Sequence, residues 1–328
     1  MEEECGRSLL DRINSFTDKN VLVIGDAIID EHVYGSVSGV SLETPTLKMN
    51  VDKTVRSAGG AGNVVKNLVG LGSRVSFATV VGDDGATDFF KSWSYNASGL
   101  DLAIVTEKDR VSPVKRKNWA DGYGVLEQEW LPMGEISNES HRELCNKIDK
   151  RLDENTYDAI IVQDMGHGVV SYDLMDQLIS SIVGVRLFAN AQISNGVSQH
   201  DKFRGVSLVS MSEKEASIVA NQYGVCSSEA NDLSRFLGPD VCVSLGSRGA
   251  NLFLGDSLYY SLASSVVPVD TCGAGDSFLS ALVLADPYDS PRDALRVANL
   301  WAGLSVEKKG TQVPNVEFLK GVARSSNG

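Results

Sequence analysis

The segment Asp270–Asp276, with the sequence DTCGAGD, places an acidic side chain directly after two closely spaced glycines and just before a long apolar run. This pattern predicts a tight turn that opens onto a helix. Gly273, Ala274 and Gly275 would aim successive backbone N–H groups at one point, where the helix dipole also favours an anion. Asp276, ionised at neutral pH, could then accept a proton from a hydroxyl that attacks a phosphoryl group. The segment predicts phosphoryl transfer with Asp276 as the base; a plain helix cap is the alternative.

Two further carboxylates follow an early apolar run. Residues 21–24 have the pattern of a buried strand that ends in Gly25 and Asp26, and Asp30 lies four residues further on. Polar groups at the carboxyl end of a strand lie where open α/β sheets bind ligands. A pair of carboxylates there can accept hydrogen bonds from adjacent sugar hydroxyls. The pair predicts an acceptor site for a sugar, with a strand-end cap at Asp26 and a solvated Asp30 as the alternative.

A glycine-rich segment precedes the next helical pattern. Gly59 and Gly60 are adjacent, which would let a ligand approach the backbone closely. Asn63, three residues later, offers both a hydrogen-bond donor and an acceptor. Two glycines before a helix indicate only a turn when taken alone. Together with the aspartates after residue 24 and with Asp276, they predict one wall of the same site.

These residues need a scaffold, and short apolar runs alternate with longer amphipathic segments along the whole chain. That alternation predicts a mostly parallel sheet with helices on both faces. We expect buried strands at 21–24, 159–162, 187–189, 208–209 and 241–245. We expect helices at 62–71, 140–152, 213–223, 277–284 and 292–306. Residues 33–56 and 100–130 break this rhythm and predict a small β-sheet lid within a single domain that spans 1–328.

Composition limits the possible partners. The 328 residues include 30 Lys and Arg against 43 Asp and Glu, a formal charge of −13. This argues against nucleic acid or a membrane as a partner, and an anionic substrate would need a local basic cluster. Five widely spaced cysteines predict neither a disulfide framework nor a zinc site. With no readable secretory signal and no long apolar run, we expect a cytoplasmic protein.

The heptapeptide DTCGAGD resembles the signature DTxGAGD of the ribokinase/PfkB family of carbohydrate kinases. In that family the last Asp is the base and the Gly-Ala-Gly backbone forms an anion hole. Residues 59–63 resemble the family's GGAAN element, which lines the sugar site. The resemblance covers residues 21–314. It implies a three-layer ribokinase-like α/β fold with a small β-sheet lid, ATP as phosphoryl donor and Mg²⁺ as the metal.

The resemblance also assigns residues to the nucleotide and the metal. Residues 243–250 resemble the family's VTxGxxG loop, and a Walker A sequence is absent. The positions implied for nucleotide binding are Ser244, Gly246, Gly249, Asn299 and Gly310. The metal-associated NxxE motif corresponds to residues 210–213, which keep the Glu and lose the Asn. This implies Glu213 as the metal-associated residue.

Three segments resemble those of bacterial kinases for heptose 7-phosphate, namely residues 41–45, 56–63 and 163–168. This makes D-glycero-D-manno-heptose 7-phosphate, phosphorylated at O1, the leading acceptor, with Asp164 in the substrate site. Lys115 and Lys117 would hold the substrate's own phosphate, or else belong to a solvated strand face. His167 and Glu127 stand where those kinases have basic residues. Another sugar or a nucleoside therefore stays open as the acceptor.

Two other classes of function compete with a kinase. A sugar- or nucleotide-binding regulator could keep this fold without turnover, but an ionised Asp in an anion-binding turn favours catalysis. A nicotinamide-dependent dehydrogenase is disfavoured because no GxGxxG fingerprint follows residues 21–24. An exposed apolar face on the lid would need cover. We therefore expect a homodimer joined lid to lid.

Overall fold

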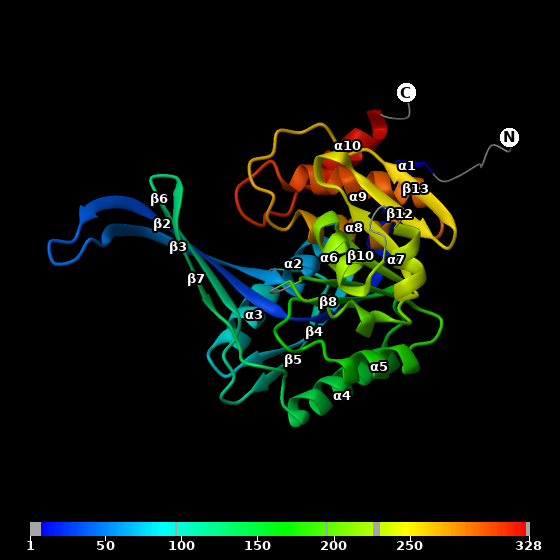
Figure 1. The fold of residues 1–328 in the computed structure, drawn as a ribbon, viewed down its shortest axis with the longest axis horizontal. Coiled ribbons are helices and arrows are strands. Elements are labelled where there is room, and N and C mark those ends of the chain that lie inside the picture. Colours follow the sequence, from blue (N-terminus) through cyan, green and yellow to red (C-terminus); the bar gives the residue numbers. More distant parts are fainter. Residues whose placement is uncertain (1–7, 96, 194–195, 226–229, 326–328) are drawn as a thin grey trace.

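The computed structural model describes residues 8–95, 97–193, 196–225 and 230–325. It contains a nine-stranded sheet with helices packed on both faces and a separate four-stranded sheet at one side (Figure 1). The strands of the large sheet, in spatial order, are β13 (Ser257–Ser261), β12 (Ala250–Leu254), β11 (Asp240–Ser244), β10 (Leu208–Ser212), β9 (Arg186–Ala191), β8 (Ala159–Asp164), β1 (Asn20–Gly25), β4 (Arg74–Gly82) and β5 (Leu100–Glu107). All neighbours from β11 to β5 pair in parallel, and β12 and β13 pair antiparallel.

The central strands are buried on both faces, which explains why they appear in the sequence as continuous apolar runs. In β1, Val21 and Val23 face one core while Leu22 and Ile24 face the other. The helices of the first core are α1 (Leu9–Asn14), α2 (Ala61–Gly70), α3 (Ala86–Ser94), α8 (Ala274–Leu284), α9 (Pro291–Ser305) and α10 (Val316–Ser325). Those of the second core are α4 (Asn138–Glu154), α5 (Tyr172–Ser181), α6 (Glu213–Tyr223) and α7 (Ala230–Leu237). Short 3-10 turns are η1 (Ser15–Asp18), η2 (His200–Phe203) and η3 (Gly246–Arg248).

The second sheet, here called the lid, has the strand order β3-β2-β6-β7. Its strands are β2 (Ala27–Val40), β3 (Leu47–Gly60), β6 (Val114–Ala120) and β7 (Tyr123–Trp130). The β2–β3 hairpin reaches far from the helices and the large sheet (Figure 1). Asp121 and Gly122 connect β6 to β7 with φ angles of 49° and 86°, as expected for the tight turn of a hairpin.

The lid differs from its predicted boundaries at two places. Its first two strands start at Ala27 and end at Gly60, beyond residues 33–56. Residues 100–107 form β5, which pairs with β4 at the edge of the large sheet and contributes nothing to the lid. Ala103 and Val105 are buried in the second core, and this burial decides which sheet the segment joins. The sequence pattern of alternating apolar residues is the same for both sheets. No helix of the described residues is long and apolar enough to cross a membrane.

Candidate active site

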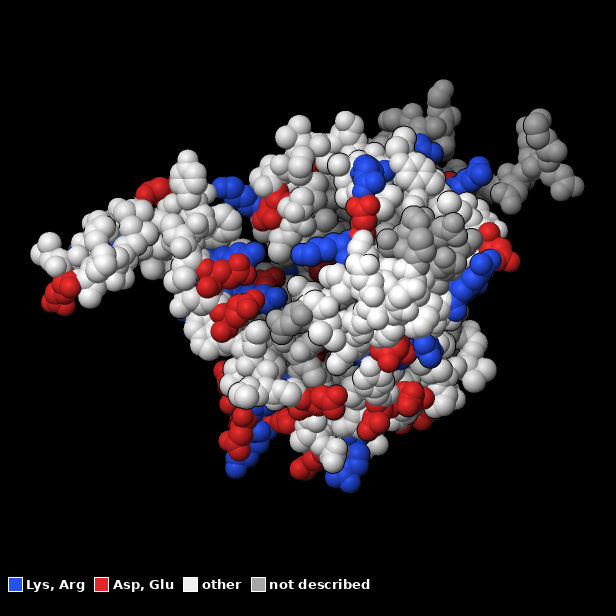
Figure 2. All heavy atoms as spheres, viewed as in Figure 1, with Lys and Arg blue, Asp and Glu red and all other residues white. Residues whose placement is uncertain are grey.

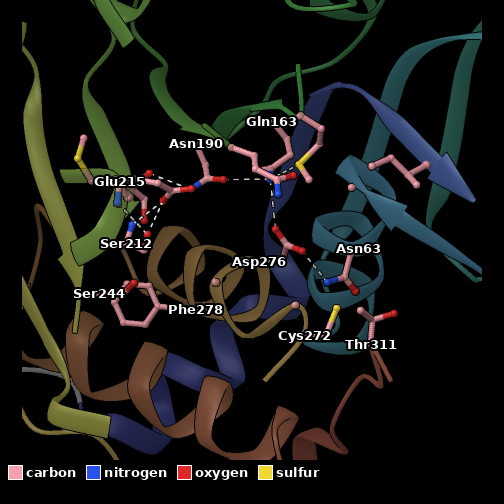
Figure 3. A pocket seen from close by; sticks show the side chains of 18 of the residues that line it. Asn63, Gln163, Asn190, Ser212, Glu215, Ser244, Cys272, Asp276, Phe278 and Thr311 are labelled. Carbon is pink, nitrogen blue, oxygen red and sulfur yellow. Dashed lines mark hydrogen bonds between the residues drawn. The ribbon is translucent and has the colours of Figure 1, made fainter. Parts of the chain in front are cut away.

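A cavity of about 330 Å³ lies between the lid, the carboxyl ends of the central strands and the N-terminus of α8 (Figure 3). Its walls come from segments that are far apart in the chain, because parallel strands end at the same edge of the sheet. The residues singled out in the sequence that line it are Asp30, Gly60, Asn63, Lys115, Ser244, Gly273, Gly275 and Asp276. The structure therefore brings the glycine-rich turn, one early aspartate and one lid lysine to one site.

Asp276 lies in the first turn of α8 with its carboxylate between two amide side chains (Figure 3). The Asn63 amide donates to Oδ2 at 2.7 Å, and the Gln163 amide donates to Oδ1 at 3.2 Å. Burial raises the pKa of Asp276 to about 6, although the Asn63 hydrogen bond acts in the opposite direction. The group is therefore ionised at neutral pH and can take up a proton just below it, as a general base requires.

The turn before α8 leaves backbone donors free. Gly273 adopts a left-handed conformation with φ 77°, and a Cβ there would lie 2.5 Å from the Asn63 amide nitrogen. Only glycine fits this position without strain. The N–H groups of Gly275 and Asp276 make no hydrogen bond to any other residue that the structure describes. Two unpaired donors at a helix N-terminus can bind a phosphoryl oxygen.

Asp30 lines the cavity, and its carboxylate packs against the backbone of Gly59. Gly60 lines the cavity beside it, and a Cβ at Gly59 would lie 2.5 Å from Asp30 Oδ2. The absence of a side chain at Gly59 is therefore what lets the carboxylate rest on the backbone. Burial raises the pKa of Asp30, and nearby Lys66 lowers it. This carboxylate is placed to accept hydrogen bonds from a polyol.

Asp26 and Asp164, also singled out as substrate ligands, have other partners. The Asp26 carboxylate is buried and accepts three backbone N–H bonds from residues 165–169, at 2.7, 3.2 and 3.0 Å. Asp164 is buried against Lys202 and accepts the N–H of Gly166 at 2.8 Å. Neither lines the cavity, so the geometry favours a structural role in holding this loop. A strand-end carboxylate binds whatever donors the fold brings to it, and here these are backbone amides.

The two lid lysines lie on the strand face that is turned toward the cavity, and each is opposed by a glutamate on β7. Lys115 lines the cavity, and its Nζ lies 3.7 Å from Oε1 of Glu129. The Nζ of Lys117 lies 3.9 Å from Oε1 of Glu127. Acidic and basic side chains are interspersed at this place on the surface (Figure 2). The positive charge that the lid offers to an anion is therefore partly compensated.

Of the five residues implied for nucleotide binding, Ser244 lines the cavity, and Gly246, Gly249, Asn299 and Gly310 do not. Ser244 lines it at the end of β11, and Gly246 begins the turn η3 with φ 61°. A Cβ at Gly249 would lie 2.0 Å from a carbonyl oxygen of β13, so this glycine is needed for packing. The Asn299 amide donates to the same carbonyl at 3.1 Å, and the Gly310 N–H donates to the first aspartate of DTCGAGD at 2.9 Å. These contacts fix the loops beside Ser244.

The glutamate implied for the metal lies outside the cavity. Glu213 is exposed and pairs with Arg248 at 2.5 Å. Glu215, two residues later, lines the cavity, and its Oε2 accepts the N–H of Ser212 at 2.7 Å in a capping box. The Ser-x-x-Glu spacing of residues 212–215 is a capping-box signal that could have found it. Among the described residues, no group of three or more metal-ligating side chains is present.

Two further residues of the site were missed in the sequence. Gln163 is the penultimate residue of β8, beside Gly25, and its amide donates to Asp276, a position that the strand-end rule could have indicated. Lys66 in α2 donates to the backbone and hydroxyl oxygens of Thr311, at 3.1 Å each. Nothing in the local sequence distinguishes this lysine from one on a solvated helix face.

With this geometry described, the whole sequence can be compared with known families. A profile described as "pfkB family carbohydrate kinase" matches residues 18–113 and 175–317. The chain belongs to the pfkB family of carbohydrate kinases. The family predicted from DTCGAGD is thereby confirmed.

Curated relatives match most of the chain. The chain is 29% identical over 323 residues to "Bifunctional protein HldE" of Caulobacter sp. (strain K31), matching 95% of this chain and 64% of the relative. It is 30% identical to the HldE protein of Desulfatibacillum aliphaticivorans over 318 residues, which are 94% of this chain and 64% of that relative. The chain thus spans slightly less than two thirds of these proteins.

Solved structures confirm the ribokinase-like fold. Phosphofructokinase-2 from Escherichia coli, in complex with potassium, superposes with a TM-score of 0.74 at 17% identity, covering 94% of this chain and 99% of that one. A ribokinase of Arabidopsis thaliana, complexed with ribose and ATP, gives a TM-score of 0.68 at 18% identity, with coverage of 93% and 99%. At these identities the likeness concerns the fold.

Proposed function

We propose that this kinase transfers the γ-phosphoryl group of ATP to a hydroxyl of a sugar or sugar phosphate, with Asp276 as the base. The observation that carries the proposal is the Asp276 carboxylate beside two N–H donors that are free among the described residues, in the same cavity as Asp30. The acceptor hydroxyl gives its proton to Asp276 as its oxygen bonds the γ-phosphorus. The bond from that phosphorus to the bridging oxygen breaks, and its electron pair leaves with ADP.

The leading acceptor is D-glycero-D-manno-heptose 7-phosphate, phosphorylated at O1. Support comes from the three segments that resemble heptose 7-phosphate kinases and from Lys115, which brings a cation to the cavity. A second candidate is an unphosphorylated sugar. It is favoured by the opposition of each lid lysine to a glutamate, Glu129 or Glu127, which reduces the charge available to a phosphate.

Mg²⁺ fits the site through Glu215. One oxygen of this carboxylate is engaged in the capping box, and the side chain lines the cavity. Mg²⁺ in kinases is held by one or two carboxylates together with water and substrate phosphates, so a single glutamate suffices. When bound, the ion would neutralise phosphate charge.

The test is ADP release with a panel of neutral sugars and sugar phosphates, with the variant Asp276→Asn as the control. We expect turnover with at least one member, strongest with a heptose 7-phosphate, and its loss in the variant. Turnover of neutral sugars alone would replace the acceptor by the second candidate. A variant as active as the parent would remove Asp276 from the role of base.

A further inference from the structure

Lys66 is the cation of α2 that is turned toward the active site. Its Nζ donates to the backbone oxygen and to the hydroxyl of Thr311, which lines the cavity. No carboxylate of the described residues lies within ion-pair distance of this nitrogen. Burial lowers the pKa of Lys66 to about 8, and the charges of Asp30 and Asp276 act against this effect. The fold therefore keeps an ammonium group inside, anchored on neutral oxygens and close to two aspartates.

The same helix also positions the proposed base. Asn63 lies three residues before Lys66, on the same side of α2, and holds Oδ2 of Asp276. Thr311, the anchor of Lys66, packs against the turn before α8, where a Cβ at Gly273 would lie 3.0 Å from its methyl group. The amide, the ammonium group and the anion-binding turn are thus parts of one contact between α2, α8 and residue 311.

The charged and polar groups that act on Asp276 come from five elements. Two of the charged groups, Asp30 of β2 and Glu215 of α6, raise the pKa of its carboxyl. Asn63 of α2 lowers it by hydrogen bonding, and Gln163 of β8 donates a second hydrogen bond. Lys66 is the cation among the groups that lower it, while Cys272 lies on the turn before α8 and also lines the cavity.

We propose that Lys66 is a positioning residue for the base: its ammonium group, anchored on Thr311, keeps the Asp276 carboxylate ionised and oriented toward the acceptor. The proposal rests on the proposed function, because it takes Asp276 to be the base. Binding of an anionic donor would otherwise disfavour a second negative charge at this place. The Lys66 ammonium group, which is held in place by Thr311, offsets this unfavourable effect on Asp276 without contacting the acceptor.

The relevant pH range follows from the two groups. Asp276 titrates at about 6 and Lys66 at about 8, so between these values the lysine is charged and the aspartate is ionised. Below pH 6 the base becomes protonated and turnover falls. Removal of the Lys66 charge raises the pKa of Asp276, so turnover begins to fall at a higher pH. An opposite charge at ~4–6 Å changes a carboxyl pKa by about 1–3, and we expect the lower end.

The first measurement needs no substrate. Carboxyl ¹³C shifts of labelled aspartate are followed against pH in the parent and in Lys66→Met, with Asp276→Asn to assign the signal. We expect the Asp276 midpoint to rise by about one pH unit in Lys66→Met and to stay near the parent value in Lys66→Arg, which keeps the charge. An unchanged midpoint in Lys66→Met overturns the proposal. If that variant fails to fold, Thr311→Val replaces it, with a smaller rise expected.

The second measurement is the pH profile of kcat with the acceptor that the panel of sugars and sugar phosphates identifies. In Lys66→Met the acid limb should move up by about one pH unit, so that kcat falls about tenfold at pH 5.5 and little at pH 8.5. A loss that is equal at all pH values indicates a merely structural role and overturns the proposal. Lys150→Met, which removes an exposed lysine paired with Glu154 on α4, is the matched control.

The two proposals can fail separately. If Asp276→Asn keeps full turnover while the Asp276 carboxyl midpoint, measured with Asp276 in place, still responds to Lys66→Met, the base assignment fails and the electrostatic coupling stands. If Asp276→Asn abolishes turnover but neither the midpoint nor the acid limb moves in Lys66→Met, only the inference about Lys66 fails.

Discussion

The two sides of the cavity are built in different ways. On the side of the large sheet, Asp276 is held by two amide side chains, and the loop beneath it is held by the buried carboxylate of Asp26. On the lid side, Lys115 and Lys117 stand on a strand of a half-exposed sheet, and glutamates lie 3.7 and 3.9 Å away. Buried hydrogen bonds fix geometry, whereas exposed ion pairs exchange easily with water and salt.

This difference separates two tasks. The chemistry of phosphoryl transfer needs one geometry and a base of suitable pKa, which a rigid and desolvated wall provides. Recognition of the acceptor needs contacts that form and release with each turnover, and the lid offers these. Changes on the sheet side should therefore affect kcat, and changes on the lid should affect the KM of the acceptor.

The largest effect is expected for Asp276→Asn. Turnover should fall by roughly 10² or more, the usual contribution of general base catalysis, while ATP still binds. Initial rates and ATP titrations measure this. Asp256→Asn, at an exposed aspartate, is the matched control and should leave turnover intact. A decrease of only a few-fold would show that the sheet side does not hold the base.

The next effect concerns the lid. Replacing both Lys115 and Lys117 by Ala should raise the acceptor KM by about tenfold or more if the acceptor carries a phosphate, because charge-assisted hydrogen bonds contribute about 1.5–3 kcal/mol each. The KM of ATP should change little. Kinetics at two salt concentrations distinguish the candidates, since salt mimics part of the loss only for a charged acceptor. Unchanged acceptor kinetics would favour a neutral sugar.

The pKa of Asp276 also predicts a gain in stability. Burial raises this pKa from 3.8 to about 6, so the folded protein is destabilised by ionisation above pH 6 and not below about pH 4. Asp276→Asn should therefore raise the free energy of unfolding by about 1–3 kcal/mol at pH 8 and by little at pH 4. Urea unfolding at both pH values measures it. If the parent and Asp276→Asn have equal free energies of unfolding at pH 8, ionised Asp276 does not destabilise the folded protein and the prediction is wrong.

A smaller effect is expected for the metal. Glu215→Gln should raise the Mg²⁺ concentration for half-maximal activity several-fold, because the variant loses a hard anionic oxygen in the cavity. Glu213→Gln, two residues away on the surface, is the matched control. Metal titrations of both variants separate the two positions. If only Glu213→Gln changes the Mg²⁺ requirement, the metal-associated residue is Glu213, as the NxxE alignment implies, and not Glu215.

The smallest effect on turnover is expected from the assembly of the lid. We propose a homodimer joined lid to lid, because the lid exposes apolar side chains such as Val51 (59%), Val55 (46%) and Leu126 (56%). Leu126→Glu should shift the molar mass measured by light scattering from dimer to monomer and leave kcat nearly unchanged. A parent that is already monomeric at working concentration contradicts the proposal.

Much of the sheet side could be predicted from the sequence. The turn at Gly273, the proposed base Asp276 and the wall at Gly60 and Asn63 all lie in short contiguous motifs, and each of these residues lines the cavity. Such motifs determine local backbone geometry, and local geometry needs no knowledge of distant contacts. The same holds for the buried strands, whose apolar runs specify burial on both faces.

What only the tertiary structure decided depends on contacts between distant segments. Residues 100–107 joined the large sheet because burial of their apolar side chains against the second core outweighed a pattern common to both sheets. The Asp26 carboxylate accepts hydrogen bonds from backbone amides more than 130 positions away, and Lys66 donates its hydrogen bonds to Thr311. Glu215 entered the cavity in place of Glu213 because a helix turns its side chains by about 100° per residue. The sequence by itself identified the family and predicted a base at Asp276, whereas the long-range packing of this fold decided which of the remaining charged side chains line the cavity, hold a loop or face the solvent.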